Sequence, residues 1–69
     1  MNLEEYRTRL GWSAEELARQ SGINAQTVRR IEKGNATWPH TAGAIAAALS
    51  RAYGREISVR DIEGLTLRE

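Results

Sequence analysis

A chain of 69 residues has room for one domain with a small hydrophobic core, so packing must be tight or a second subunit must add to it. It holds no cysteine and one histidine, which excludes disulfides and thiolate metal sites and leaves no acid–base–nucleophile set for an enzyme. Ten basic and nine acidic side chains give a formal net charge of +1, so only the placement of charge could indicate a nucleic-acid partner.

The sequence has no signal for a membrane or for secretion. The longest weakly polar run covers residues 42–49, far short of the roughly 20 apolar residues that a membrane span needs. The first five residues lack the basic start of a signal peptide. We therefore expect a cytoplasmic protein with a single domain over residues 1–69 and without a membrane partner, a metal or a cofactor.

Helix signals begin with the first residues of the chain. Asn2 is placed as the cap of a first helix, which Gly11 ends. Leu3, Tyr6 and Leu10 fall on one face of this helix, at the spacing of a buried stripe.

The next signals predict two short helices around a glycine turn. Ser13 with Glu16 is a capping box for the second helix, in which each side chain satisfies a backbone N–H of the other residue. Asn24 is placed to cap a third helix over about residues 25–33. Gly22 lies between the two helices, where a residue without a Cβ takes positive φ at little cost, so the third helix leaves at a sharp angle.

A loop and a fourth helix follow. Residues 34–40 form the only long loop, since Pro39 disfavours helix in the residue before it. The fourth helix covers about residues 41–53 and ends at Gly54. Its apolar stripe consists of Ala42, Ile45, Ala48, Leu49 and Ala52.

The end of the sequence predicts one more short helix. Ser58, with Asp61 three positions on, is typical of a cap, and Val59 and Ile62 are its apolar residues. Residues 66–69 are expected to form a frayed tail.

Residues spread over the second, third and fourth helices carry a family resemblance. They are Leu17, Ala18, Gly22, Ile23, Val28, Ile31, Glu32, Gly34, Pro39, Ile45, Ala46, Ala48 and Leu49. Over roughly residues 3–65 the chain resembles the helix-turn-helix domain of the Cro/C1 (XRE-type) family of phage and bacterial repressors. The resemblance implies an all-α, compact, five-helix lambda-repressor-like fold. Its helix-turn-helix motif would cover about residues 14–33, with a recognition helix at 25–33 in the major groove of double-stranded DNA.

The resemblance also implies which residues read bases: the first two positions of the recognition helix and the exposed residue one turn later. These are Ala25, Gln26 and Arg30. Gln26 suits bidentate contact with adenine and Arg30 suits O6 and N7 of guanine, each good pair discriminating by ~1–3 kcal/mol. Ala25 could touch only a thymine methyl. The alternative is that the basic residues of this helix simply solvate its outer face.

Five further residues are candidates for contacts to phosphates or flanking bases: Thr27, Arg29, Lys33, Asn35 and His40. His40 stands where some relatives place an arginine near the minor groove, and an ordinary surface role is the favoured alternative. Trp38 is expected to pack against the fourth helix rather than against sugar-phosphate.

Relatives also pair an arginine of the first helix with the glutamate that ends the third, here Arg7 and Glu32. A partly buried pair would fix the recognition helix against the first helix, and we expect this arrangement. In the alternative, Arg7 stays at the surface and meets Glu4 on its own helix, a contact worth only ~0.3–0.5 kcal/mol.

The region after the fourth helix forms the dimer contact in relatives, which implies a homodimer. The interface candidates are Ile57, Val59, Arg60 and Ile62, although Val59 and Ile62 serve equally well as core residues. The two recognition helices of such a dimer would meet palindromic half-sites ~34 Å apart.

These features predict a small transcriptional regulator, a repressor, that binds double-stranded DNA sequence-specifically. Two departures from relatives favour an alternative, a protein-interaction or antitoxin-like module with a protein partner. Ala14 replaces the usual glutamine that holds a phosphate, and residues 35–38 carry no charge where relatives are often basic. Affinity and its salt dependence should therefore be modest.

Overall fold

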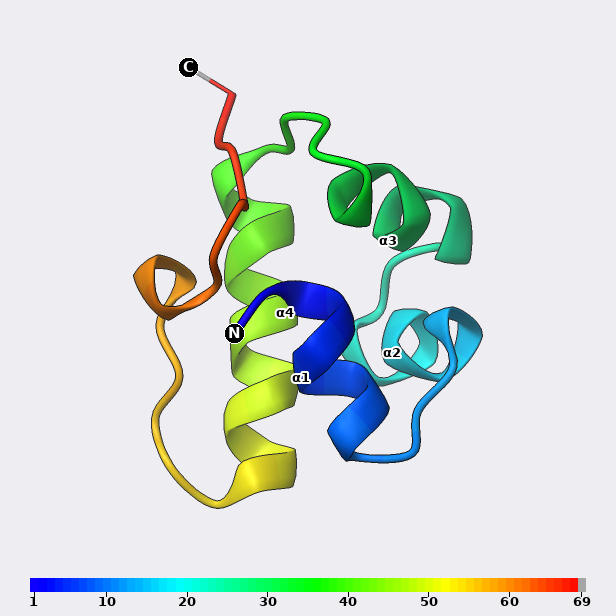
Figure 1. The fold of residues 1–69 in the computed structure, drawn as a ribbon, viewed down its shortest axis with the longest axis vertical. Helices are drawn as coiled ribbons and strands as arrows, with labels where there is room; N and C mark the ends of the chain where they lie inside the picture. Colours follow the sequence, from blue (N-terminus) through cyan, green and yellow to red (C-terminus); the bar gives the residue numbers. More distant parts are fainter. Residues whose placement is uncertain (69) are drawn as a thin grey trace.

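Four α-helices and one 3₁₀ turn make up the computed structural model, which describes residues 1–68. They are α1 (Leu3–Arg9), α2 (Ala14–Ser21), α3 (Ala25–Glu32), α4 (Pro39–Tyr53) and the 3₁₀ turn η1 (Val59–Asp61). The long α4 has α1, α2 and α3 along one side and η1 on the other (Figure 1). The all-α fold is confirmed, with a 3₁₀ turn in place of the expected fifth helix. Within residues 1–68, no helix combines the length and the apolar character needed to cross a membrane.

The helix caps follow the sequence, with one difference. The Asn2 side chain accepts from the N–H of Glu5 (2.8 Å) while the Glu5 carboxylate accepts from the N–H of Asn2 (2.7 Å), so α1 has the full capping box. Ser13 caps α2 by accepting from the N–H of Glu16 (3.0 Å). The predicted return bond from Glu16 is wrong, because this carboxylate accepts from Arg19 and Gln20 instead.

The turn between α2 and α3 has the predicted geometry. Gly22 is left-handed, with φ 75°, and its N–H donates to the carbonyl of Ala18. The Asn24 side chain accepts from the N–H of Thr27 at 2.8 Å, which starts α3. These two local devices set the angle at which α3 leaves α2.

The core lies where α2, α3 and α4 meet. Its fully buried side chains are Leu17, Val28, Ile45 and Leu49, and each contributes ~1.5–3 kcal/mol by burial. From α1, the ring of Tyr6 packs edge-on against Tyr53, with centroids 5.7 Å apart. A single cluster of side chains therefore holds all four helices.

α4 differs from its prediction at both ends. It starts at Pro39, two residues early, because the first helical position needs no N–H and proline is preset for it. It ends before Gly54, as predicted, in a left-handed cap with φ 70°. Ala52 is exposed and does not belong to the buried stripe. Tyr53 takes the inward position in this last turn, and its hydroxyl donates to the carbonyl of Tyr6 at 2.8 Å.

The segment 66–68 is paired with the loop before α4, so the prediction of a frayed tail is wrong for these residues. The N–H of Thr37 donates to the carbonyl of Thr66 (2.8 Å), and the N–H of Arg68 donates to the carbonyl of Thr37 (2.7 Å). Thr37 is buried, 5% exposed. In Figure 1 this part of the chain runs upward beside the start of α4. Glu69, the last residue of the predicted tail, lies outside the described residues.

Candidate nucleic-acid interface

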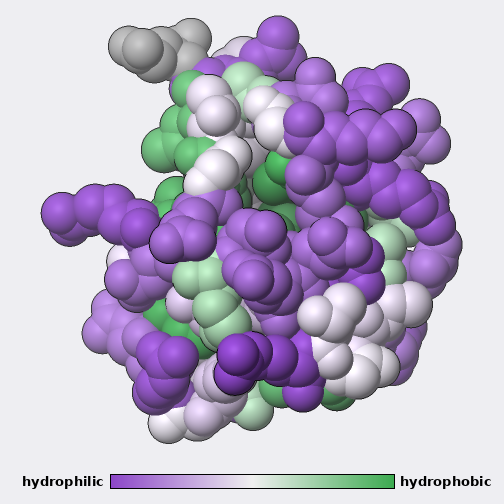
Figure 2. Space-filling view, in the orientation of Figure 1, coloured by the Kyte–Doolittle hydropathy of each residue, from purple (hydrophilic) through white to green (hydrophobic). Residues whose placement is uncertain are grey.

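α3 has two faces of opposite character. Val28 and Ile31 are 0% and 4% exposed and belong to the core. Gln26, Arg30 and Lys33, spaced i, i+4 and i+7, are exposed on the other side. Hydrophilic side chains cover most of the face seen in Figure 2, including the region of α3. α3 with its cap residue Lys33 therefore offers one amide and two cationic groups to a partner.

The three candidates for base reading are placed differently. Gln26 and Arg30 are both exposed and lie one turn apart. Ala25 is half-buried and packs against the core. Thr27 is half-buried as well, and its N–H is held by the cap of α3. The accessible reading groups of the first two turns are thus Gln26 and Arg30.

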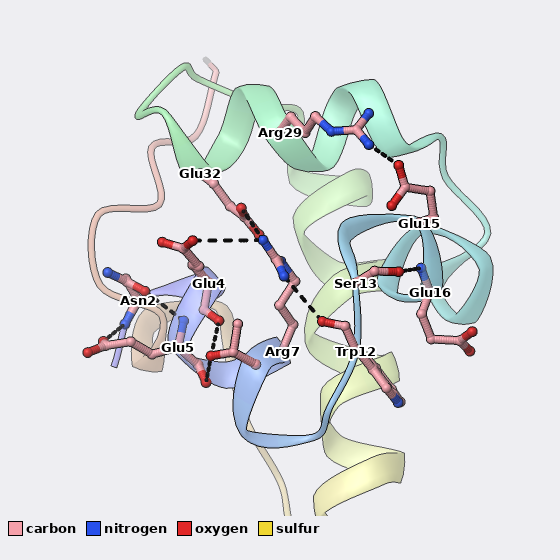
Figure 3. Close-up of polar contacts among 11 residues, drawn as sticks. Asn2, Glu4, Glu5, Arg7, Trp12, Ser13, Glu15, Glu16, Arg29 and Glu32 are labelled. Carbon is pink, nitrogen blue, oxygen red and sulfur yellow. Dashed lines mark hydrogen bonds and ion pairs between the residues drawn. The ribbon is translucent and has the colours of Figure 1, made fainter.

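The start of α2 differs from a phosphate-binding helix start. Ala14 is 7% exposed and belongs to the core, so this position contributes packing and no polar group. Glu15 follows it and forms a salt bridge across to Arg29 of α3 (Figure 3). The pair is at the surface, with side-chain exposures of 63% and 50%. A phosphate approaching Arg29 would therefore compete with a carboxylate.

A second ion pair fixes the end of α3. Nε of Arg7 donates to Oε2 of Glu32 at 2.6 Å, and Nη2 donates to Oε1 at 3.0 Å (Figure 3). The two side chains are only 15% and 12% exposed. Arg7 also donates to the carbonyl of Trp12 (3.2 Å) and lies 3.9 Å from Glu4, a longer and single contact.

This bidentate pair joins three segments of the motif. It links α1, the loop before α2 and the end of α3, so the recognition helix is anchored by charge at one end and by apolar contacts along its length. The hydrogen bond to Glu32 holds the pKa of Arg7 above its ordinary value, and the charge of Glu32 acts in the same direction, against the opposing effect of burial.

The loop between α3 and α4 closes the same side of the molecule. The N–H and the side-chain amide of Asn35 both donate to the carbonyl of Arg30, at 3.0 and 3.1 Å, so this residue caps α3. His40 is exposed in the first turn of α4. Trp38, which we expected to pack against α4, is 50% exposed, and the guanidinium of Arg68 lies over its ring, 5.0 Å from the centroid.

The four interface candidates separate into two kinds. Ile57 and Ile62 are 2% and 3% exposed and complete the core, so their side chains are not available to a second subunit in this conformation. Val59 is half-buried and Arg60 is exposed. The chain after α4 folds back onto the core because Ser50 binds it: its hydroxyl accepts from the N–H of Ile57 at 2.8 Å.

Two residues of this surface were not found from the sequence. Glu15 neutralises Arg29 across the motif, and its place beside Ala14 at the start of α2 was the available signal. Arg68 reaches the surface next to α3 only because residues 66–68 pair with Thr37. The alternation of Leu65, Thr66, Leu67 and Arg68 has the period of an extended strand, which could have indicated the pairing.

The comparisons with known proteins agree with this geometry. A protein-family model described as Helix-turn-helix matches residues 3–60, more than half of the chain, and includes α1 to α4. Neither the curated proteins nor the solved structures give a significant match. The chain therefore belongs to the Cro/C1-type (XRE) helix-turn-helix family of DNA-binding regulatory domains.

Proposed function

We propose that the protein is a sequence-specific transcriptional regulator that places α3 in the major groove of double-stranded DNA. The observation that carries the proposal is the exposed stripe of Gln26, Arg30 and Lys33 on a helix whose other side is fixed in the core. The side chains of Gln26 and Arg30 have the donor and acceptor groups that distinguish adenine and guanine at their major-groove edges. Lys33 is suited to a phosphate.

A homodimer on a palindromic operator follows from the small size of this surface. One copy of α3 offers two accessible reading side chains in its first two turns, which specify few base pairs, and a two-fold pair doubles that number. Exposed Arg60 and half-buried Val59 are the members of the proposed interface that a partner could reach. Occupation of an operator is sufficient for repression, which makes a repressor the simplest regulator of this kind.

The test is selection of binding sites from random duplex DNA at two salt concentrations. Arg30→Ala should weaken binding to the selected site and relax the preference at one position, by ~1–3 kcal/mol. Arg55→Ala is the matched control, since Arg55 is exposed and lies beyond the far end of α4. Enrichment of a palindrome that depends on Arg30 and not on Arg55 supports the proposal. Equal effects of the two substitutions would contradict it.

The second candidate is a protein-interaction module of the same fold, and the start of α2 favours it. Buried Ala14 removes one phosphate anchor, and Glu15 occupies Arg29. If the wild-type protein enriches no duplex even at low salt, the surface of α2 and α3 serves a protein partner instead.

A further inference from the structure

Residues 66–68 bring a second arginine to the surface beside α3. The two backbone hydrogen bonds between Thr37 and this segment form a parallel bridge, at 2.8 and 2.7 Å, around a buried Thr37. Because both bonds involve the main chain, they fix the direction of the segment whatever its side chains are. Arg68 is thereby held next to the loop that connects α3 to α4.

Arg68 and Arg30 line the same hollows. One, of about 290 Å³, is bounded by Arg30, Asn35, Ala36 and Arg68. A neighbouring one, of about 160 Å³, is lined by Thr27, Arg30, Ile31, Ala36, Thr37, Trp38 and Arg68. The reading surface of α3 thus continues over the loop to Arg68, without a wall between them.

The charge of Arg68 is positioned and remains available. Its guanidinium stacks over the exposed ring of Trp38, 5.0 Å from the centroid. Stacking on an aromatic face restrains the guanidinium plane and leaves its edge N–H groups free to donate. Within residues 1–68 neither Arg30 nor Arg68 lies within salt-bridge distance of a carboxylate, whereas Arg7, Arg19 and Arg29 each do.

We propose that Arg68, stacked on Trp38, binds a phosphate of the DNA backbone next to the bases that α3 reads. The inference rests on the proposed DNA-binding function and extends its surface to residues beyond the matched part of the chain. A planar guanidinium held by stacking suits the paired oxygens of a phosphate. The bridge at Thr37 would supply one of the phosphate anchors that Ala14 and the uncharged loop do not.

The experiment measures anisotropy of a fluorescein-labelled duplex of mixed sequence over a salt series. Arg68→Ala should lower the affinity roughly tenfold at low salt, equally for all sequences. It should also reduce the slope of log K against log salt by about 0.9, the value for one lost phosphate contact. Arg55→Ala, the matched control, should leave the slope unchanged. Arg68→Glu should weaken binding more than Arg55→Glu does.

The outcomes separate this inference from the proposed function. If wild type binds and Arg30→Ala weakens it, but Arg68→Ala behaves like Arg55→Ala, the inference is overturned and the proposed function stands. If wild type binds no duplex at the lowest salt, both are overturned. Circular dichroism melts of Arg68→Ala and wild type should coincide, because an exposed side chain is removed, and a lowered melting temperature would assign Arg68 a structural role instead.

Discussion

Removal of Glu32 is the change that should damage this fold most for its size. In Glu32→Ala the guanidinium of Arg7, 15% exposed, would lose both bonds of its bidentate partner and keep the Trp12 carbonyl and a 3.9 Å contact with Glu4. Breaking a buried pair on one side costs ~3–5 kcal/mol, and the remaining exposure and Glu4 place this case near ~3 kcal/mol. At ~0.05–0.15 kcal/mol per residue a domain of this length has a total stability of only ~3–10 kcal/mol.

Urea denaturation followed by circular dichroism measures this loss as a lower midpoint at unchanged slope. Glu15→Ala is the matched control, because it removes the acidic half of an exposed pair on the same motif and should cost only ~0–1 kcal/mol. A second variant, Arg7→Met with Glu32→Leu, removes both charges together and should cost less than Glu32→Ala alone. Coincident denaturation curves for Glu32→Ala and Glu15→Ala would refute the reasoning.

Three further predictions concern the cap, the acid limit and the surface charge. Asn24→Ala removes the acceptor for the N–H of Thr27 and should lower the free energy of unfolding by ~1 kcal/mol in urea denaturation; an unchanged midpoint would mean that packing alone starts α3. The pKa of Asp61 is held below its ordinary value, first by the backbone N–H of Ser58 and then by the Ser58 hydroxyl. Its contribution is therefore present above the unfolded pKa and lost as the pH falls through the folded one. Asp61→Asn should flatten the decline in melting temperature below about pH 4, and curves of equal steepness would contradict this. Glu15→Ala should strengthen binding to mixed-sequence duplex and steepen its salt dependence, because it frees Arg29 for a phosphate; unchanged anisotropy titrations would show that Arg29 stays away from DNA.

The framework of this domain was predictable because short-range rules determine it. Asn2, Ser13 and Asn24 are cap residues whose partners lie three positions away, and Gly22 occupies a left-handed position that few other residues tolerate. The burial of Val28 and Ile31 follows from helical spacing in the same way. Each of these features needs only the neighbouring sequence, so no tertiary contact could overturn it.

The remainder depended on contacts between distant segments. Glu16 was expected to complete a capping box, but Arg19 and Gln20 offer its carboxylate charged and amide donors on the same helix. Residues 66–68 pair with Thr37, far away in the sequence, and nothing local distinguishes such a bridge from a frayed end. Ile57 and Ile62 could serve an interface or a core equally well, and their burial was decided by how the chain returns to α4.

The arginines of this chain divide into two classes, and the division bears on how a domain of net charge +1 could bind DNA. Arg7, Arg19 and Arg29 form salt bridges with Glu32, Glu16 and Glu15, so their charges are balanced within the fold. The cations around α3 without a carboxylate at that distance, within residues 1–68, are Arg30, Lys33 and Arg68. Few phosphates can then be neutralised by one copy, and each adds about 0.9 to the salt slope. Since affinity from so few contacts is low, two copies on one palindrome would give the complex both its stability and its specificity.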